Sequence, residues 1–257
     1  MRPLTEIGGR RLPLLRWSVL RMAVGFRHMS TQGQVGDGRE EALARYLEAR
    51  ARPGDVDDAI RVIDEFCYRH SAMMNVGDEK GVVLERAVRR AQPRRLLELG
   101  TYCGYSALRM ARVMPQNARL RSIEFNPANA AVARRIWSHA GVGERVSVVV
   151  GSLGDGGQTL ARLEGEHDFS DGGLDFVFID HDKAAYLHDL QRILDCLWLH
   201  PGSVVVADNV RLPGAPKYRA YMQAQEGQHW RTTEHHPHLE YQSLIRDLML
   251  ESEYLGD

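Results

Sequence analysis

The sequence has few of the features that mark several classes of protein. Its three cysteines, Cys67, Cys103 and Cys196, lie far apart without a C-x-x-C pair, so neither a disulfide scaffold nor a structural zinc site is expected. Lys and Arg number 33 against 34 Asp and Glu, and this lack of a basic excess argues against a dedicated nucleic-acid binder. No apolar run approaches the ~20 residues that span a bilayer. We therefore expect a cytoplasmic protein without a transmembrane segment or a nucleic-acid partner.

The 257 residues are 44% hydrophobic and 26% charged, a globular composition that allows one or two domains. The first 30 residues differ, because they carry six Arg and one Glu, with apolar residues at helical spacing between positions 15 and 26. This pattern fits a basic surface helix or a targeting sequence. The preferred interpretation is a disordered extension translated from an upstream start codon, since Met22 and Met29 follow. We predict an extension over 1–38 and one domain over 39–257.

From residue 95 onward, short continuous apolar runs alternate with helical stretches, a pattern typical of buried parallel strands. The expected strands are 95–99, 120–125, 145–150, 174–180 and 203–208. The expected helices lie at 39–51, 55–69, near 78–93, and then near 104–114, 127–140, 155–164, 184–197 and 216–225. Five such units predict a doubly wound α/β sheet. Residues 229–257 are expected to add two antiparallel edge strands.

An acidic residue stands at the end of four of these strands: Glu98, Glu124, Asp180 and Asp208. Ligands of open α/β sheets bind beyond the carboxyl ends of the strands. These four acids therefore indicate a binding site at that edge.

The first strand continues as ELGTYCGYS (98–106), in which Gly100 allows a tight turn and the close approach of a ligand. The spacing is not the dinucleotide G-x-G-x-x-G, and Glu98 would repel a pyrophosphate but suit a cationic group. Glu124 can accept the two hydroxyls of a ribose. An amino group, a ribose and no phosphate together describe S-adenosylmethionine. The alternative is a helix-capping turn with an exposed glutamate.

The fourth and fifth strands end in FIDHDK (178–183) and ADNVRLPGAP (207–216). Asp180, Asp208 and Asn209 supply oxygen ligands of the kind that Mg²⁺ prefers. Lys183 follows closely and, beside a divalent cation, would lose its proton readily enough to act as a general base. The alternative is that the Asp and Asn residues are helix N-caps and that Lys183 is a solvated side chain. His181 is interpreted as a hydrogen-bonded spacer.

Two further features carry weaker interpretations. The HHPH run at 235–238 is interpreted as a solvated loop rather than a metal site. Cys103 is interpreted as a small packing residue, because no paired histidine is implied.

These residues resemble the catechol O-methyltransferase family from about residue 40 to the end. In chain order the similar segments are MNVGDEKG (74–81), LLELGTYCGYSALRMAR (96–112), IEFNP (123–127), FIDHDKAAYL (178–187), ADNVRLPGAP (207–216) and LEYQSLI (239–245). The resemblance implies a Rossmann-like class I methyltransferase fold, with seven strands and an antiparallel last strand. It also implies S-adenosylmethionine, Mg²⁺ and methylation of one hydroxyl of a small-molecule catechol. The expected state is a monomer, with a weak homodimer as the alternative.

The resemblance assigns a role to each matching position. Mg²⁺ falls to Asp180, Asp208 and Asn209, the general base is Lys183, and Glu240 would bind the hydroxyl that is not methylated. Pro213 would form an apolar wall. The cofactor positions are Met74, Val76, Glu98, Gly100, Tyr102, Tyr105, Ser106, Glu124 and Asp180.

The chain departs from the animal enzymes at two positions, where Ala72 and Asp182 replace tryptophans that flank the site. The D-x-D-K form of 180–183 is also similar to plant caffeoyl-CoA O-methyltransferases. One alternative is therefore methylation of larger vicinal-diol phenolics, such as caffeoyl, flavonoid or siderophore-like catechols. Another is a non-catalytic binding protein with this fold, which would be expected to lose the base or the metal ligands.

Overall fold

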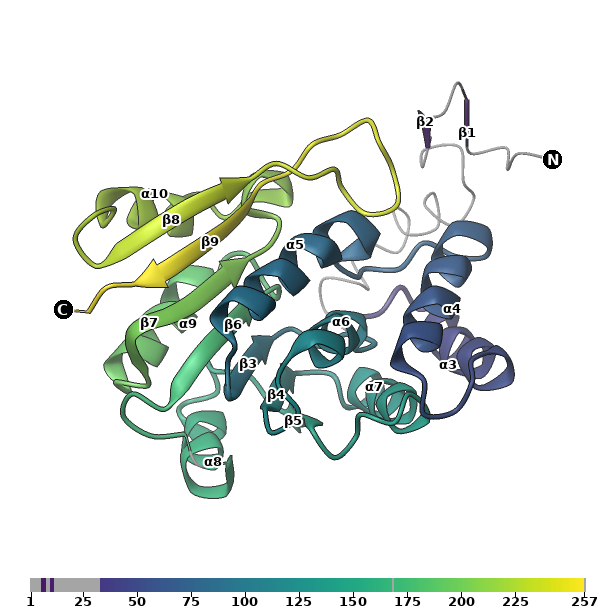
Figure 1. Cartoon of the computed structure of the whole chain (residues 1–257), viewed down its shortest axis with the longest axis horizontal. Helices are drawn as coiled ribbons and strands as arrows, with labels where there is room; N and C mark the ends of the chain where they lie inside the picture. The colour runs from purple at the N-terminus through teal and green to yellow at the C-terminus, as the bar shows by residue number, and fades with distance from the viewer. Residues whose placement is uncertain (1–5, 8–9, 12–32, 168, 257) are drawn as a thin grey trace.

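The computed structural model of the chain describes residues 6–7, 10–11, 33–167 and 169–256 (Figure 1). The strands are β1 (Glu6–Ile7), β2 (Arg10–Arg11), β3 (Arg95–Leu99), β4 (Arg119–Glu124), β5 (Val146–Val150), β6 (Leu174–Ile179), β7 (Leu199–Ala207), β8 (Trp230–His235) and β9 (Met249–Tyr254). The helices are α3 (Arg39–Arg50), α4 (Val56–Arg69), α5 (Gly77–Ala91), α6 (Tyr105–Val113), α7 (Pro127–His139), α8 (Gln158–His167), α9 (Tyr186–Asp195) and α10 (Pro216–Ala224), with a π-helical turn η2 (Val210–Gly214) before α10.

Seven strands form one sheet in the order β5-β4-β3-β6-β7-β9-β8. Strands β3 to β7 are parallel, whereas β9 is antiparallel to both of its neighbours. Strands β4 and β5 lie on one side of β3, and β6 and β7 lie on the other, which places a topological switch point between β3 and β6. This arrangement confirms the predicted doubly wound sheet with an antiparallel last strand, the Rossmann-like methyltransferase fold.

Two details of the predicted strands were wrong. The strand expected at 203–208 begins four residues earlier, because a register shift at Leu174/Phe176 lets Leu199 pair with Leu174. Of the two C-terminal strands expected at an edge, only β8 lies there, because β9 inserts between β7 and β8. Strand β9 thus brings the residues that precede it beside the end of β7.

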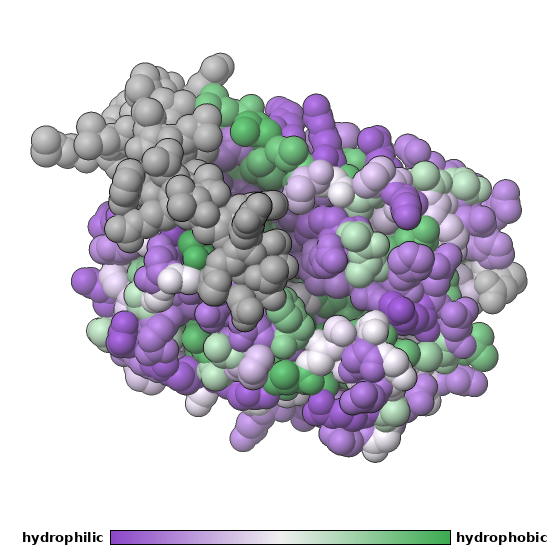
Figure 2. All heavy atoms as spheres, turned by 180° about the vertical axis from the view of Figure 1, so that it is seen from behind, coloured by the Kyte–Doolittle hydropathy of each residue, from purple (hydrophilic) through white to green (hydrophobic). Residues whose placement is uncertain are grey.

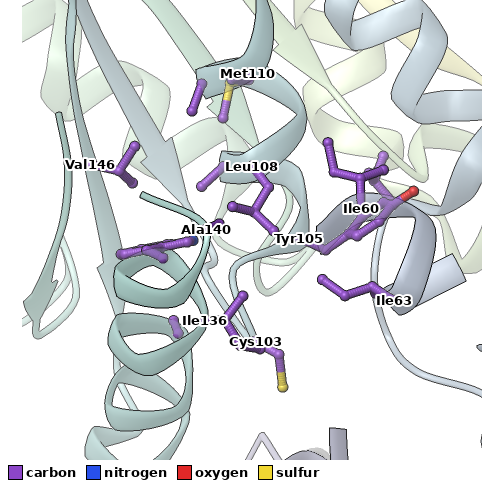
Figure 3. Packing of buried hydrophobic residues seen from close by; sticks show 14 of the residues in the cluster. Ile60, Ile63, Cys103, Tyr105, Leu108, Met110, Ile136, Ala140 and Val146 are labelled. Carbon is purple, nitrogen blue, oxygen red and sulfur yellow. The ribbon is translucent and has the colours of Figure 1, made fainter. Parts of the chain in front are cut away.

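Helices cover both faces of the sheet and enclose two separate cores (Figure 1). Side chains of one strand alternate between them: Phe176 and Phe178 of β6 face the core under α3 to α7, and Val177 and Ile179 face the core under α8 to α10. Figure 3 shows part of the first core, where Ile60 of α4 lies near Tyr105 of α6. Burial on both faces explains why the strands are apolar without interruption.

Local signals set where two of the helices begin. The Asp55 carboxylate accepts the backbone N–H of Asp58 at 2.9 Å, and the Asn126 side chain accepts that of Ala128 at 2.7 Å. Pro127 follows at the first position of α7, where no hydrogen bond is lost. Because β4 ends at Glu124, two residues before Asn126, this cap holds the carboxyl end of β4 close to the start of α7.

Residues 33–38 pack against the start of α7. The Gln34 side chain donates to Asn129 Oδ1 at 2.8 Å, and Asn129 Nδ2 donates to the carbonyl of Gly33 at 3.0 Å. Within residues 1–32 the structure describes only the short antiparallel pair β1 and β2. The predicted helical spacing between residues 15 and 26 lies outside the described residues, and the domain boundary at residue 38 stays a prediction. Viewed from behind, the described surface is mostly hydrophilic with scattered apolar residues (Figure 2). Among the helices that the structure describes, none has the length and hydropathy to cross a bilayer.

Candidate active site

Hydrogen bonds between neighbouring strand ends align the four predicted acids at one edge of the sheet. The N–H of Asp180 donates to the carbonyl of Leu99 at 2.9 Å, and the N–H of Asp208 donates to that of Ile179 at 3.0 Å. On the other side of β3, the N–H of Gly100 donates to the carbonyl of Ile123 at 3.0 Å. The chain therefore leaves β3, β4, β6 and β7 at the same level, and their terminal acids face a common region.

The turn after β3 requires glycine for steric reasons. Gly100 has a φ of 101°, and a Cβ atom there would lie 2.5 Å from the carbonyl oxygen of Asp180. Gly104 has a φ of 81°, and a Cβ would lie 2.4 Å from Nε1 of Trp137. Tyr102 adopts a φ of 47° between them. The two glycines thus let the turn pass close to β6 and α7, which shapes the floor of the site.

Glu98 is fully buried rather than exposed, so the alternative of a capping turn with a solvated glutamate does not describe it. Its two carboxylate oxygens accept hydrogen bonds from the hydroxyls of Ser106 in α6 and Ser122 in β4. Burial raises the pKa of Glu98 to about 8, against these hydrogen bonds, and the charges of Asp180 and Glu124 raise it further. A cationic group placed nearby would stabilise the carboxylate form.

Glu124, the last residue of β4, is buried at the opposite side of the turn. Its Oε2 accepts the N–H of Tyr102 at 2.8 Å, and its Oε1 accepts the N–H of Asn126 at 2.9 Å and more distantly Asn129 Nδ2 at 3.5 Å. Burial raises the pKa of Glu124 despite these donors. Phe125 follows and is 54% exposed. The carboxylate is therefore held rigidly beside an exposed aromatic ring.

Lys183 lies within a short chain of hydrogen bonds at the ends of β6 and β7. Its Nζ lies 2.8 Å from Oδ1 of Asp180 and 2.6 Å from the hydroxyl of Tyr186. The Tyr186 hydroxyl donates in turn to the carbonyl of Asp208 at 3.0 Å, and its ring is fully buried. His181 stacks on the Tyr186 ring and bonds Asp189 at 2.8 Å. The hydroxyl of Tyr186 thus holds the amine of Lys183 beside Asp180.

Asp208 is fully buried, and its two oxygens have different surroundings. Oδ1 accepts the N–H of Asn209 at 2.7 Å and lies 2.9 Å from Nζ of Lys80. Oδ2 is buried without a hydrogen-bond partner in the described part of the chain. Burial raises the pKa of Asp208 to about 7, against the attraction of Lys80. An uncompensated buried oxygen of this kind is a suitable ligand for a cation.

The predicted metal ligands come together, but they do not form an all-carboxylate cluster. Asp180 and Asp208 end adjacent parallel strands, and Asn209 follows with a φ of 53°. Within the residues that the structure describes, no group of three or more His, Cys, Asp or Glu side chains forms a metal-binding cluster. The candidate cation site therefore consists of two carboxylates and one amide.

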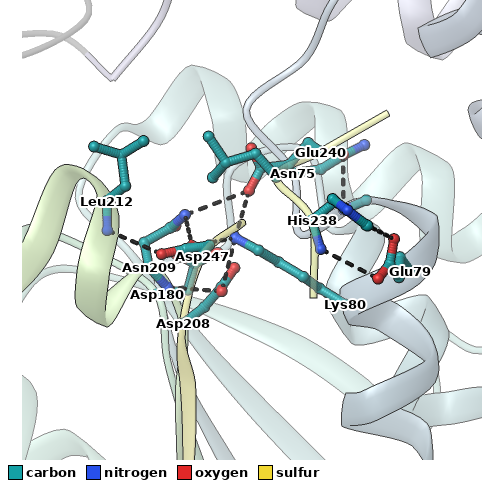
Figure 4. Close-up of polar contacts among 12 residues, drawn as sticks. Asn75, Glu79, Lys80, Asp180, Asp208, Asn209, Leu212, His238, Glu240 and Asp247 are labelled. Atoms are coloured by element: carbon teal, nitrogen blue, oxygen red, sulfur yellow. Dashed lines mark hydrogen bonds and ion pairs between the residues drawn. The ribbon is translucent and has the colours of Figure 1, made fainter. Parts of the chain in front are cut away.

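Glu240 reaches the same region from the loop between β8 and β9 (Figure 4). Its Oε1 lies 2.8 Å from Nζ of Lys80 and 3.4 Å from Nδ2 of Asn209. Gly77 at the start of α5 makes room for it, because a Cβ there would lie 3.1 Å from the Cα of Glu240. Val76 is buried just before this point, and Met74 is partly buried.

Other predicted positions have additional roles. The phenol of Tyr105 is buried, and its hydroxyl donates to Asp64 at 2.6 Å, so this side chain is engaged with α4. The exposed Asp182 accepts the N–H of Ala184 at 3.1 Å. The carbonyl of Ala72 accepts a hydrogen bond from the buried Arg39 at 2.5 Å. The two positions that depart from the animal enzymes therefore present a small side chain and a carboxylate bound to its own turn.

The sequence interpretation missed two residues of the site, Lys80 and Asp247. Both are fully buried, and Nζ of Lys80 lies 2.7 Å from Oδ2 of Asp247. Burial alone would lower the pKa of Lys80, but the charges of Asp208, Glu240 and Asp247 outweigh burial and raise it. One sequence signal could have identified Lys80, because it lies one helical turn before Leu84 on the face of α5 that is buried.

Comparison with known proteins identifies a family for most of the chain. Residues 56–246 match the model of an O-methyltransferase family. A protein named a probable O-methyltransferase of Mycobacterium tuberculosis is 62% identical over 235 residues, which cover 91% of this chain and 100% of that protein. Catechol O-methyltransferase of Mus musculus is 36% identical over 214 residues, which cover 83% of this chain and 78% of the mouse protein.

A solved structure supports the fold. The O-methyltransferase TomG of Streptomyces achromogenes, in complex with SAM, aligns with a TM-score of 0.62. The alignment covers 94% of this chain and 100% of TomG at 21% sequence identity. At that identity, the likeness concerns the arrangement of helices and strands alone.

Proposed function

Because the chain belongs to the O-methyltransferase family, we propose that it transfers the methyl group of S-adenosylmethionine to one hydroxyl of a catechol, with Mg²⁺ and a lysine base. The observation that carries this proposal is the convergence of Asp180, Lys183 and the orphaned Oδ2 of Asp208 beside the glycine turn. One site then contains a base, cation ligands and a cradle for the methyl donor.

The turn after β3 supports a methyl donor that carries an amino acid group and a ribose. Glu98 provides buried negative charge for a cationic group, and the rigid Glu124 carboxylate suits the ribose hydroxyls. Gly100, Tyr102 and Ser106 would line the same cradle, and S-adenosylmethionine supplies there an electrophilic methyl group on a sulfonium. TomG was solved with SAM, which supports this choice of donor, and the name of the mouse relative, catechol O-methyltransferase, supports a catechol as the acceptor.

The donor set fits Mg²⁺, because Asp180, Asp208 and Asn209 offer oxygen atoms and Asp208 Oδ2 has no hydrogen-bond donor among the residues that the structure describes. Bound there, Mg²⁺ would stabilise negative charge on a neighbouring acceptor oxygen. Lys80 already neutralises one carboxylate charge at this place, since its Nζ lies 2.9 Å from Asp208 Oδ1. The protein can therefore hold its acidic ligands close together before any cation binds.

Lys183 is placed to receive the proton of the attacking hydroxyl. In its neutral form the amine has two hydrogens and one lone pair. Asp180 Oδ1 and the Tyr186 hydroxyl accept two hydrogen bonds from Nζ, so the lone pair remains for the incoming proton. The deprotonated oxygen would then displace the methyl group from sulfur in line. Holding both reactants in the correct orientation can supply ~7–11 kcal/mol of the barrier reduction.

Glu240 would accept a hydrogen bond from the second hydroxyl and so determine which oxygen is methylated. Its position is set by Lys80 and by the close approach of Gly77. The η2 turn and the loop before β9 also expose apolar side chains, Leu212 at 41%, Leu244 at 42% and Ile245 at 40%. These side chains favour, as a second candidate, catechols that carry a bulky apolar substituent.

Transfer of a labelled methyl group from S-adenosylmethionine to a panel of catechols tests the proposal. We expect product with Mg²⁺, none in excess chelator, and recovery when Mg²⁺ is restored. The methyl donor should still bind the chelated protein, because its proposed contacts lie elsewhere. Full turnover in chelator would exclude the cation, and transfer only to monophenols would exclude the catechol.

A further inference from the structure

We propose that Asp247, together with Lys80, is a positioning residue that turns the Asn209 amide so that its Oδ1 faces the cation site. This inference rests on the proposed function. Asp247 lies seven residues beyond Glu240 and two residues before the start of β9, and it is fully buried.

The contacts of Asp247 determine the orientation of the Asn209 side chain (Figure 4). Asp247 Oδ2 accepts a hydrogen bond from Asn209 Nδ2 at 2.9 Å, while its Oδ1 accepts the backbone N–H of Leu212 at 2.9 Å. A carboxylate only accepts hydrogen bonds, whereas an amide has one donating and one accepting end. Pairing the nitrogen with Asp247 therefore leaves the oxygen of Asn209 as the end available to a cation.

Lys80 holds Asp247 in place and connects it to the rest of the site. Its ammonium group donates hydrogen bonds to Glu240 Oε1 at 2.8 Å and to Asp247 Oδ2 at 2.7 Å, and it forms an ion pair with Asp208 Oδ1 at 2.9 Å. These partners come from the end of β7 and from the loop before β9. One buried lysine thus fixes three acids from different parts of the chain relative to one another.

A reversed Asn209 amide would direct two N–H hydrogens toward the cation, which repels them. Asn209 follows Asp208 directly in the chain, and its backbone is left-handed, with a φ of 53°. Residues that orient metal ligands typically contribute about 10–100-fold to metal affinity. Loss of Asp247 should therefore weaken cation binding without removing any ligand.

The test measures binding of Mn²⁺, as a paramagnetic substitute for Mg²⁺, by electron paramagnetic resonance on the full chain. Asp247→Asn should weaken Mn²⁺ binding by about 10-fold or more, with the affinity for S-adenosylmethionine unchanged. Glu85→Gln is the matched control, since Glu85 is a buried acid on the same helix as Lys80, paired with Arg109 and Arg112. The control should bind Mn²⁺ like the parent.

The exchange variant Asn209→Asp/Asp247→Asn separates orientation from general packing. It restores a donor–acceptor pair between positions 209 and 247 at the same net charge, leaves Lys80 with Asp208 and Glu240 as its partners, and presents carboxylate oxygen to the cation, so Mn²⁺ affinity should return to within about threefold of the parent. If Asp247→Asn does not fold, the exchange variant is compared with Asn209→Asp alone. That single variant places two carboxylates, at positions 209 and 247, against each other, so it should bind Mn²⁺ at least about 10-fold more weakly than the exchange variant.

Three results overturn the inference. Parent-like Mn²⁺ affinity in Asp247→Asn would show that Asp247 does not orient the ligand. If the Mn²⁺ affinity of the exchange variant does not exceed that of the single variant with which it is compared, Asp247 has only a packing role. In both cases the proposed function stands if the parent binds one Mn²⁺. A parent that binds no Mn²⁺ would instead overturn the proposed cation site along with the inference.

Discussion

The backbone N–H of Tyr102 donates to Oε2 of Glu124 at 2.8 Å, which ties the turn after β3 to the last residue of β4. This bond links the ends of two neighbouring parallel strands, and its donor is the backbone of Tyr102, which has a left-handed conformation. The carboxylate is thereby fixed before a ligand arrives. A fixed carboxylate loses little conformational entropy when it binds a ribose.

Replacing Glu124 with Ala should weaken the binding of S-adenosylmethionine. Two hydrogen bonds to a charged group contribute about 1.5–3 kcal/mol each, so we expect a loss of affinity of at least about 100-fold. Isothermal titration calorimetry measures this change, and the exposed Glu144→Ala serves as its control. Unchanged affinity would remove Glu124 from the proposed donor site.

Replacing Lys183 with Ala should lower kcat by about 10²-fold or more, the range for loss of a general base. The affinity for the methyl donor should stay within about twofold, because no proposed donor contact is lost. Lys217→Ala, an exposed lysine of α10, is the matched control and should behave like the parent. Turnover of Lys183→Ala within a few-fold of the parent would mean that another group takes the proton.

Glu98 should make the ligand-free protein less stable as the pH rises. Burial raises its pKa to about 8, well above its usual value of 4.5. Between these values the folded state keeps a proton that the unfolded chain has released, so the free energy of unfolding falls from about pH 5 to about pH 8. Glu98→Gln has no such proton, and the pH slope of its Tm should be flatter. Parallel Tm profiles for parent and variant would contradict the assigned shift.

Two truncations should distinguish the contribution of residues 33–38 to stability and donor binding from that of residues 1–32. Deleting 1–38 removes Gly33 and Gln34, which hold the side chain of Asn129 by hydrogen bonds. Asn129 in turn donates a hydrogen bond to Glu124. We expect a lower Tm and an affinity for the methyl donor about 3–10-fold weaker, the effect of losing one ordinary hydrogen bond. Deleting only 1–32 should leave both quantities close to those of the full chain. Equal behaviour of the two truncations would show that residues 33–38 do not support the site.

Ala72→Trp should narrow the proposed acceptor site. An added aromatic wall contributes about 0.5–1.5 kcal/mol to ring stacking, so KM for a small catechol should fall by about 2–10-fold. KM for a caffeoyl-sized acceptor should rise, because the wall occupies its space. The Arg39 hydrogen bond goes to the backbone carbonyl of Ala72 and is retained. If both KM values stay unchanged, position 72 does not border the acceptor.

The sequence by itself determined the parallel part of the sheet and the edge at which the site lies. Continuous apolar runs such as LDFVFID indicate strands that are buried on both faces. Parallel strands end at the same edge, so the acids Glu98, Glu124, Asp180 and Asp208 could be placed together without coordinates. Local chemistry was sufficient here because each signal lies within a few residues of its own strand.

Only the tertiary structure decided how the acids are paired and buried. Lys80 and Asp247 are separated by 167 positions, and no local pattern connects a lysine in α5 with an aspartate before β9. Their contact exists because β9 inserts beside β7 and carries the preceding loop across the start of α5. Asp208 is fully buried in this packing, which raises its pKa, and its Oδ2 has no hydrogen-bond partner in the described part of the chain. Burial depends on the packing of the whole chain, and for that reason the composition of a single segment could not reveal it.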